Sequence, residues 1–151
     1  MAKKKKVRPI PKGYRSVTAS LNLADSREFV AFCKQAFRAT LRGDYILGPE
    51  GKVLHGEILI GDSVVMVSDA DREPARPVNL FLYVEKVDKT FAKAVKAGAK
   101  VLMPLETQFW GDRMGRLEDP FGNRWAIATH VEDVTPKELK KRMASMKPPE
   151  A

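Results

Sequence analysis

His55 and Glu57 are the residues of this chain whose types and spacing best suit acid–base or metal chemistry. They are two positions apart in a segment expected to be a strand, and side chains at that spacing point to the same face. An imidazole beside a carboxylate can transfer a proton or supply two ligands to a divalent metal. A salt-bridged pair on a sheet surface would have the same pattern. His55 and Glu57 are therefore candidate catalytic and ligand-binding residues, with a purely structural role as the alternative.

A second group of chemistry-bearing side chains lies in QFWGDRMGRLEDPFGNRW, residues 108–125. Its glycines and prolines are typical of turns between closely spaced strands, and residues 119–122 predict a β-turn with proline in the second position. Asp112 is expected to pair with a nearby arginine and hold the hairpin. Trp125 is expected in the core. The members that could reach a cavity are Phe109, Trp110 and Arg124.

The elements that must position these side chains follow a clear order in the first half of the chain. Alternating apolar and polar residues predict a strand at 16–24, and Asp25 or Ser26 then offers the N-cap of an amphipathic helix. Turn residues separate three further strands, which are predicted at 40–46, 53–60 and 64–67. The pattern is βαβββ.

The same pattern returns in the second half, and Leu21 and Leu82 mark it at a spacing of 61 positions. A strand at 79–84 precedes a helix that Gly98 ends. The remaining strands are predicted at 100–103, 114–119 and 124–130. We expect an α+β fold in which two βαβββ modules form one curved mixed sheet, with helices on its convex face and a polar-lined concave pocket.

Length and patterning predict a single domain at residues 15–134, built from modules at about 15–69 and 77–134 with a linker at 70–76. A disordered basic tail is expected at 1–14. A C-terminal helix and tail are expected at 135–151, because Thr135, Pro136 and Glu138 form a capping-box arrangement.

The net charge of +8 is concentrated at the two ends of the chain, since residues 1–15 hold seven basic and no acidic side chains. Nucleic-acid binding is therefore not expected beyond weak electrostatic attraction to the tails. No apolar run approaches the roughly 20 residues of a membrane span, so no membrane partner is expected. The single cysteine, Cys33, cannot form an internal disulfide, which favours a cytoplasmic location.

Three segments of the chain resemble the vicinal oxygen chelate superfamily, and in particular its PhnB-like, glyoxalase/bleomycin-resistance branch. They are GKVLHGEILIGDSVVMVSD (51–69), LFLYVEKVDKTFAKAVKAGA (80–99) and FWGDRMGRLEDPFGNRWAIATH (109–130). The resemblance covers about residues 15–134 and implies the glyoxalase/bleomycin-resistance/dioxygenase fold. It also implies a homodimer with the pocket shared between subunits.

The resemblance implies where a metal would bind. In the metal-dependent members of this superfamily, His, Glu or Gln ligands converge from the first and last strands of each module. The matching positions here are Thr18, Met66, Asn79 and Ala126. None is a good ligand for zinc, nickel or iron, which take imidazole, carboxylate or thiolate. No metal cofactor is therefore expected at the usual site.

The function expected is that of a metal-free small-molecule-binding protein of the glyoxalase/bleomycin-resistance type, with its ligand in the concave sheet. The alternative is a metal-dependent lyase or dioxygenase with a divergent zinc, nickel or iron site around His55 and Glu57. The expected ligand-binding residues are Asn79, Phe81, Tyr83, Trp110, Arg124, Glu57 and His55. Alternation extends the possible pocket lining to Thr18, Ser20, Asn22, Ala126 and Ala128.

Overall fold

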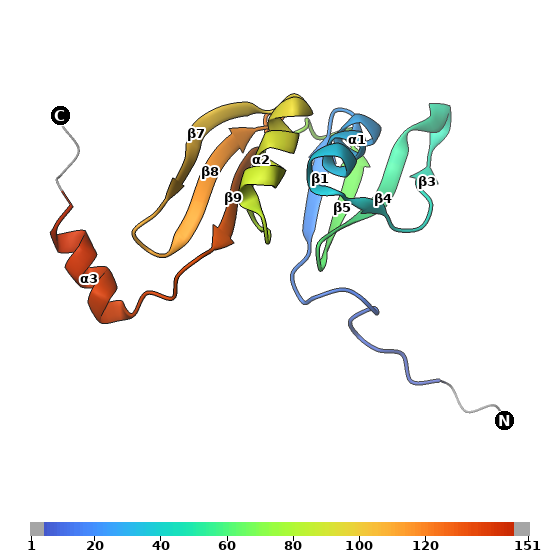
Figure 1. The fold of residues 1–151 in the computed structure, drawn as a ribbon. Helices are drawn as coiled ribbons and strands as arrows, with labels where there is room; N and C mark the ends of the chain where they lie inside the picture. The colour runs from blue at the N-terminus through green and yellow to red at the C-terminus, as the bar shows by residue number, and fades with distance from the viewer. Residues whose placement is uncertain (1–4, 147–151) are drawn as a thin grey trace. The chain divides into compact units, whose positions relative to one another are not determined.

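The computed structural model describes residues 5–146 and divides the chain into two compact units between Arg76 and Pro77. Figure 1 shows one helix and one sheet in each unit, followed by a C-terminal helix. The second unit has the order βαβββ before its C-terminal helix, and the first has the same order with one strand split into the short β2 and β3, so the predicted α+β fold with two modules is confirmed. No helix in the described part of the chain is long and apolar enough to span a membrane.

The first module forms a mixed sheet in the order β1-β5-β4-β2, with the short strand β3 also paired to β4. Strand β1 runs parallel to β5, and the other neighbours are antiparallel. Helix α1 packs on β1, β4 and β5. The elements are β1 (Ala19–Leu23), α1 (Ser26–Phe37), β2 (Thr40–Leu41), β3 (Ile46–Leu47), the 3-10 turn η1 (Pro49–Gly51), β4 (Val53–Ile60) and β5 (Ser63–Asp69).

The start of α1 follows from its sequence. Asp25 is the N-cap, and its carboxylate accepts the backbone N–H of Glu28 at 3.0 Å. The helix buries one face, which includes Phe29 and Cys33, against the sheet. It ends at Arg38, which takes the left-handed conformation at φ 57°.

The second module forms a mixed sheet in the order β6-β9-β8-β7, with β6 parallel to β9 and the other pairs antiparallel. Helix α2 packs on β7, β8 and β9. The elements are β6 (Asn79–Tyr83), α2 (Val87–Lys96), β7 (Lys100–Thr107), β8 (Asp112–Glu118), β9 (Arg124–His130) and the C-terminal α3 (Pro136–Ala144).

Three predicted strands differ most from the structure in their bounds. The strand expected at 40–46 is split into β2 and β3, because Gly43 between them has a positive φ of 71° that interrupts the extended backbone. The first strand starts only at Ala19. Strand β7 continues to Thr107 instead of ending at Met103, since register shifts in the β7–β8 pair accommodate a proline that cannot donate to the ladder.

The turn at 119–122 is confirmed, with the Gly122 N–H donating to the Asp119 carbonyl at 3.1 Å. The buried Asp119 carboxylate also accepts the backbone N–H groups of Phe121 and Asn123, and the indole N–H of Trp125 at 2.9 Å. Trp125 is buried as predicted. Thus one aspartate fixes the turn, the start of β9 and a core tryptophan.

The ends of the chain bear on two predictions. Helix α3 begins at Pro136 as predicted, and the Thr135 hydroxyl accepts the N–H of Glu138 at 3.2 Å. The predicted disordered tail at 1–14 lies partly at residues 1–4, outside the described residues, as do the last five residues at the C-terminus. Residues 5–18 hold no helix or strand, yet Lys12 and Tyr14 contact the first sheet.

Candidate functional site

The open face of the second sheet contains a hollow of about 660 Å³. Three of the predicted ligand-binding residues, Asn79, Phe81 and Arg124, line it together. The remaining lining residues are Leu80, Leu102, Met103, Arg116, Trp125 and Ala126. The structure therefore brings the Phe81 ring, the Asn79 amide and two guanidinium groups to a single concave surface.

The position of the hollow follows from the strand register. Phe81 on β6 lies opposite Ala126 on β9, and Ala126 lies opposite Arg116 on β8. The small Ala126 side chain between these two larger ones leaves space above the centre of the sheet. Phe81 is 51% exposed, so one side of its ring is available for stacking.

The polar groups of the hollow favour an anionic ligand. The Nε atom of Arg124 lies 3.9 Å from a Glu118 oxygen, and the Arg124 side chain is largely exposed. No carboxylate forms an ion pair with Arg116 within the described residues 5–146. Both guanidinium groups can thus donate to a bound carboxylate or phosphate. Arg116 was not predicted from the sequence. Its alternation with Met114 and Glu118 on one strand could have indicated that the three side chains share a face.

Tyr83 and Trp110 were predicted in the same pocket, but they do not line the hollow. The Tyr83 hydroxyl donates to Asp112 at 2.8 Å, and the Trp110 indole N–H donates to the same carboxylate oxygen at 2.9 Å. His130 Nδ1 lies 2.8 Å from the other Asp112 oxygen. Asp112 is buried, so this network joins β6, β8 and β9 inside the second module. Tyr83 still contacts Phe81, with ring centroids 4.9 Å apart.

This Asp112 network was not predicted. Asp112 was expected to pair with an arginine, but Arg113 instead forms a bidentate pair with Asp88 at 2.7 and 2.9 Å. Burial acts to raise the pKa of Asp112, yet the hydrogen bonds from His130, Tyr83 and Trp110 lower it below its ordinary value. Hydrogen bonds to Asp133 and Asp112 raise the pKa of His130. The network therefore favours a charged carboxylate with a charged imidazole.

His55 and Glu57 lie together in the first module, as their spacing predicted, with His55 Nε2 3.1 Å from a Glu57 oxygen. The Glu57 carboxylate already has two other partners. Arg42 donates to one oxygen at 3.0 Å, and the Tyr14 hydroxyl donates to the other. The Arg42 guanidinium also lies over the Tyr14 ring, 4.9 Å from its centroid. Glu57 is therefore a partly buried structural anchor with little capacity left for a ligand.

The comparisons with known proteins agree with this architecture. The family profile described as "Glyoxalase/Bleomycin resistance protein/Dioxygenase superfamily" matches residues 16–127. The chain belongs to this superfamily. An uncharacterized protein of Mycobacterium bovis is 33% identical to this one over 142 residues, which cover 86% of this chain and 93% of the relative.

Two solved structures illustrate the fold of the superfamily. The PhnB protein of Bacillus cereus matches with a TM-score of 0.62 at 18% identity, covering 76% of this chain and 99% of that one. TioX of Micromonospora sp. ML1 matches with a TM-score of 0.61 at 22% identity, covering 77% and 100%. The resemblance and the fold predicted from the sequence are confirmed, and membership supports a fold suited to small-molecule binding.

The metal site of the superfamily's metal enzymes does not fit the residues present. Thr18 and Met66 line one shallow hollow of the first module, and Asn79 and Ala126 line the hollow of the second. Each pair thus shares a face, as the predicted alternation requires. A hydroxyl, a thioether, an amide and a methyl group form a poor donor set for zinc, nickel or iron. Within residues 5–146, no three His, Cys, Asp or Glu side chains are grouped to hold a metal.

Proposed function

We propose that this protein binds a small organic molecule, without a metal ion, in the hollow of its second module. The observation that carries the proposal is the lining of that hollow by Phe81, Asn79, Arg116 and Arg124. Its volume of about 660 Å³ is within the usual range for small-molecule sites, roughly 300–1,000 Å³. Binding without chemical conversion is also the behaviour of bleomycin-resistance proteins in this superfamily.

The lining indicates how the ligand would be held. A planar group would stack on the exposed face of Phe81, while Arg124 and Asn79, which are opposite each other across β6 and β9, would hold a polar group. Arg116 would neutralise a negative charge on the ligand. Tyr83 and Trp110 would act indirectly, because their hydrogen bonds to Asp112 hold the adjacent part of the sheet in place.

The binding test is a thermal-shift screen of aromatic acids and antibiotics on the full chain, followed by calorimetric titration of any hit. Arg124→Gln and Phe81→Ala should each weaken the affinity about tenfold or more, as expected for a lost charged hydrogen bond or stacking surface. Arg72→Gln is the matched control, since Arg72 is exposed outside the hollow. Equal loss in all three variants would contradict the location of the site.

The competing function is a metal-dependent lyase or dioxygenase centred on His55 and Glu57. Metal analysis of the purified protein distinguishes the two hypotheses. Stoichiometric zinc, nickel or iron that is lost in both His55→Ala and Glu57→Ala would replace the binding-protein proposal with the enzyme. Metal-free protein that still binds the screened ligand supports the proposal.

We also propose that the protein is a cytoplasmic homodimer. In the first module, Ile46, Leu47 and Leu54 are each more than half exposed around the β3–β4 pair, which is an apolar surface suited to a second copy. The chain has one cysteine, the buried Cys33, so it cannot form an internal disulfide, which is compatible with a reducing compartment. Sedimentation equilibrium of the protein and of Leu54→Glu tests the dimer, and a monomeric wild type would refute it. Cell fractionation tests the location.

A further inference from the structure

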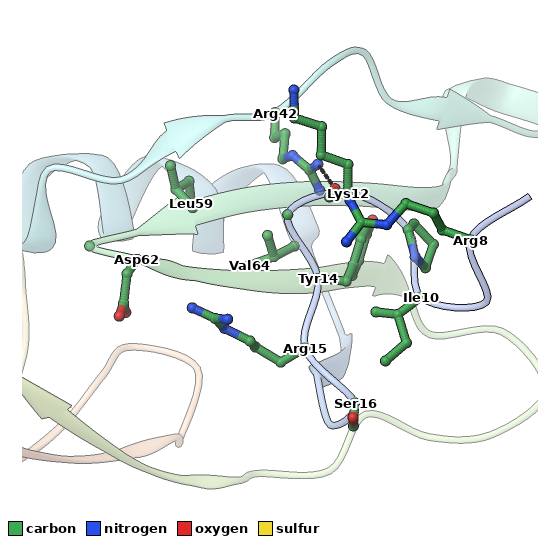
Figure 2. A pocket seen from close by; sticks show the side chains of 13 residues that line it. Arg8, Ile10, Lys12, Tyr14, Arg15, Ser16, Arg42, Leu59, Asp62 and Val64 are labelled. Atoms are coloured by element: carbon green, nitrogen blue, oxygen red, sulfur yellow. Dashed lines mark hydrogen bonds between the residues drawn. The ribbon is translucent and has the colours of Figure 1, made fainter.

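The first module has a second hollow, separate from the proposed ligand site, between residues 8–16 and the ends of β2, β4 and β5. Its volume is about 710 Å³. Figure 2 shows the N-terminal segment beside the sheet, with Arg8 and Arg15 on opposite sides of Tyr14. Four basic side chains line this hollow, namely Arg8, Lys12, Arg15 and Arg42.

The N-terminal segment is attached at defined points. Arg42 donates to the Lys12 carbonyl at 2.8 Å, which is the dashed line in Figure 2. The Tyr14 hydroxyl donates to Glu57, and the Tyr14 N–H closes a turn onto the Pro11 carbonyl at 3.1 Å. The hollow is therefore built from specific contacts between residues that are about 30 to 43 positions apart.

Gly13 is needed for this attachment. Its φ of +87° is unfavourable for residues with a side chain, and a Cβ there would lie 2.8 Å from an Arg42 nitrogen. The close approach lets Arg42 reach both the Lys12 carbonyl and Glu57. A side chain at position 13 would strain the backbone and displace the Arg42 guanidinium, and so would weaken this attachment.

The charges of the hollow are not balanced within the protein. Arg42 is neutralised by Glu57, but no carboxylate pairs with Arg8, Lys12 or Arg15 in the part of the chain that the structure describes. Of the described residues that line the hollow, Asp62 alone carries a carboxylate. Three free cations against one carboxylate give a net charge of +2, which a dianion would neutralise.

The same hollow also offers apolar surface from Ile10, Leu59 and Val64. A phosphate monoester has about two negative charges at neutral pH and an organic group that such a surface can cover. Guanidinium groups match the oxygens of a phosphate with paired hydrogen bonds. We propose that this hollow is a binding site for a small organic phosphate.

The test is a titration of the full-length, ¹⁵N-labelled protein with phenyl phosphate, with phenol as the uncharged control. Phenyl phosphate should cause saturable shifts of the amide signals of residues 8–16 and Val64, and phenol should not. Because NMR reports each residue, binding in the second-module hollow is recorded separately. The two proposals can therefore fail independently.

Three variants sharpen the test. Arg15→Gln and Arg8→Gln should each raise the Kd for phenyl phosphate about tenfold, and Gly13→Ala should abolish the shifts while the sheet signals persist. Lys34→Gln, which removes an exposed charge from α1 in the same module, should change the Kd less than about twofold. Equal weakening by Lys34→Gln would overturn the proposal. Absence of saturable shifts, or a preference for single-stranded oligonucleotides that grows with their length, would overturn it as well.

Discussion

The two modules share one order of elements but differ in what covers the open face of each sheet. At matching positions, the first module has Met66 between Ser20 and Glu57, whereas the second has Ala126 between Phe81 and Arg116. Tyr14 of the N-terminal segment and Arg42 both donate to the Glu57 carboxylate, while Arg116 lacks an ion pair in residues 5–146. Duplication thus keeps the scaffold, and a few side chains decide what the open face of each sheet can bind.

The largest expected effect is on stability and concerns two carboxylates, the buried Asp119 of the second module and the partly buried Asp69 of the first. Asp119→Ala would remove the shared acceptor of several donors, including the Trp125 indole N–H, and should lower the free energy of unfolding of the second module by about 4 kcal/mol. Asp69→Ala, which removes the acceptor for the N–H groups of Ser26 and Val53, should cost about 2 kcal/mol.

Urea denaturation followed by circular dichroism measures both changes. Asp119→Asn is the matched control, because it keeps one acceptor oxygen and should be less destabilising than alanine. Equal losses for Asp119→Ala and Asp69→Ala would show that the two carboxylates are equivalent, contrary to the difference in the number of donors that they bind.

The second effect is on ligand affinity. The variant gives the second module the methionine that the first module has at the matching position. Ala126→Met would place the bulk of Met66 at the centre of the second hollow and should weaken binding of any screened ligand at least about thirtyfold, or about 2 kcal/mol. The melting temperature should change little, since Ala126 is on the open face. Isothermal titration calorimetry measures the affinity, and unchanged binding would place the ligand elsewhere.

The third effect is smaller and concerns the N-terminal segment. Tyr14→Phe removes the hydroxyl that donates to Glu57, so the segment should detach more often, with a loss of about 1 kcal/mol in local stability. Hydrogen exchange of residues 12–16 should become several-fold faster while exchange in β6 and β9 stays the same. Tyr83→Phe is the control, because the Tyr83 hydroxyl donates to Asp112 in the second module. In this variant exchange should become faster in β6 and β9 and stay the same in residues 12–16.

The smallest effect is a pH dependence confined to the second module. The raised pKa of His130 contributes stability that is complete below its ordinary value of 6.5 and is lost as pH rises through the folded-state pKa. The lowered pKa of Asp112 contributes stability that is present above 3.8 and is lost as pH falls through the folded-state pKa. The network should therefore stabilise the second module most between pH 3.8 and 6.5.

Denaturation midpoints measured from pH 3 to pH 9 test this window. His130→Gln should flatten the decline on the alkaline side, since glutamine does not titrate. The effect is modest because His130 is half-exposed and its contact with the fully exposed Asp133 is screened by solvent. A decline of the same size in His130→Gln would assign the pH dependence to another group.

Much of the fold could be predicted because its signals are local. Strands β4 and β9 have the predicted bounds, and Asp25 and Thr135 cap the predicted helices, since alternation and capping involve residues close in sequence. The split of the strand at 40–46 was missed because a glycine with positive φ cannot be distinguished from other glycines by sequence alone.

The candidate site was predicted in part for the same reason. Alternation placed Asn79 and Phe81 on one face, and Arg124 was singled out in the segment 108–125 as able to reach a cavity. Arg116 was missed because its place in the hollow depends on how β8 pairs with β9. The Glu57 carboxylate has little capacity left for a ligand partly because it accepts a hydrogen bond from Tyr14, 43 positions away. No local sequence pattern indicates such a contact.

The hydrogen bonds of the two tryptophans have a practical consequence for following this molecule in solution. Trp110 and Trp125 are the only tryptophans of the chain, and both lie in the second module with their indole N–H groups on Asp112 and Asp119. Tryptophan emission therefore reports on the second module alone, whereas tyrosines belong to both modules, with Tyr14 and Tyr45 in the first and Tyr83 in the second. The chain thus contains an optical signal specific to one half, and unfolding of the second module can be followed in an unlabelled sample.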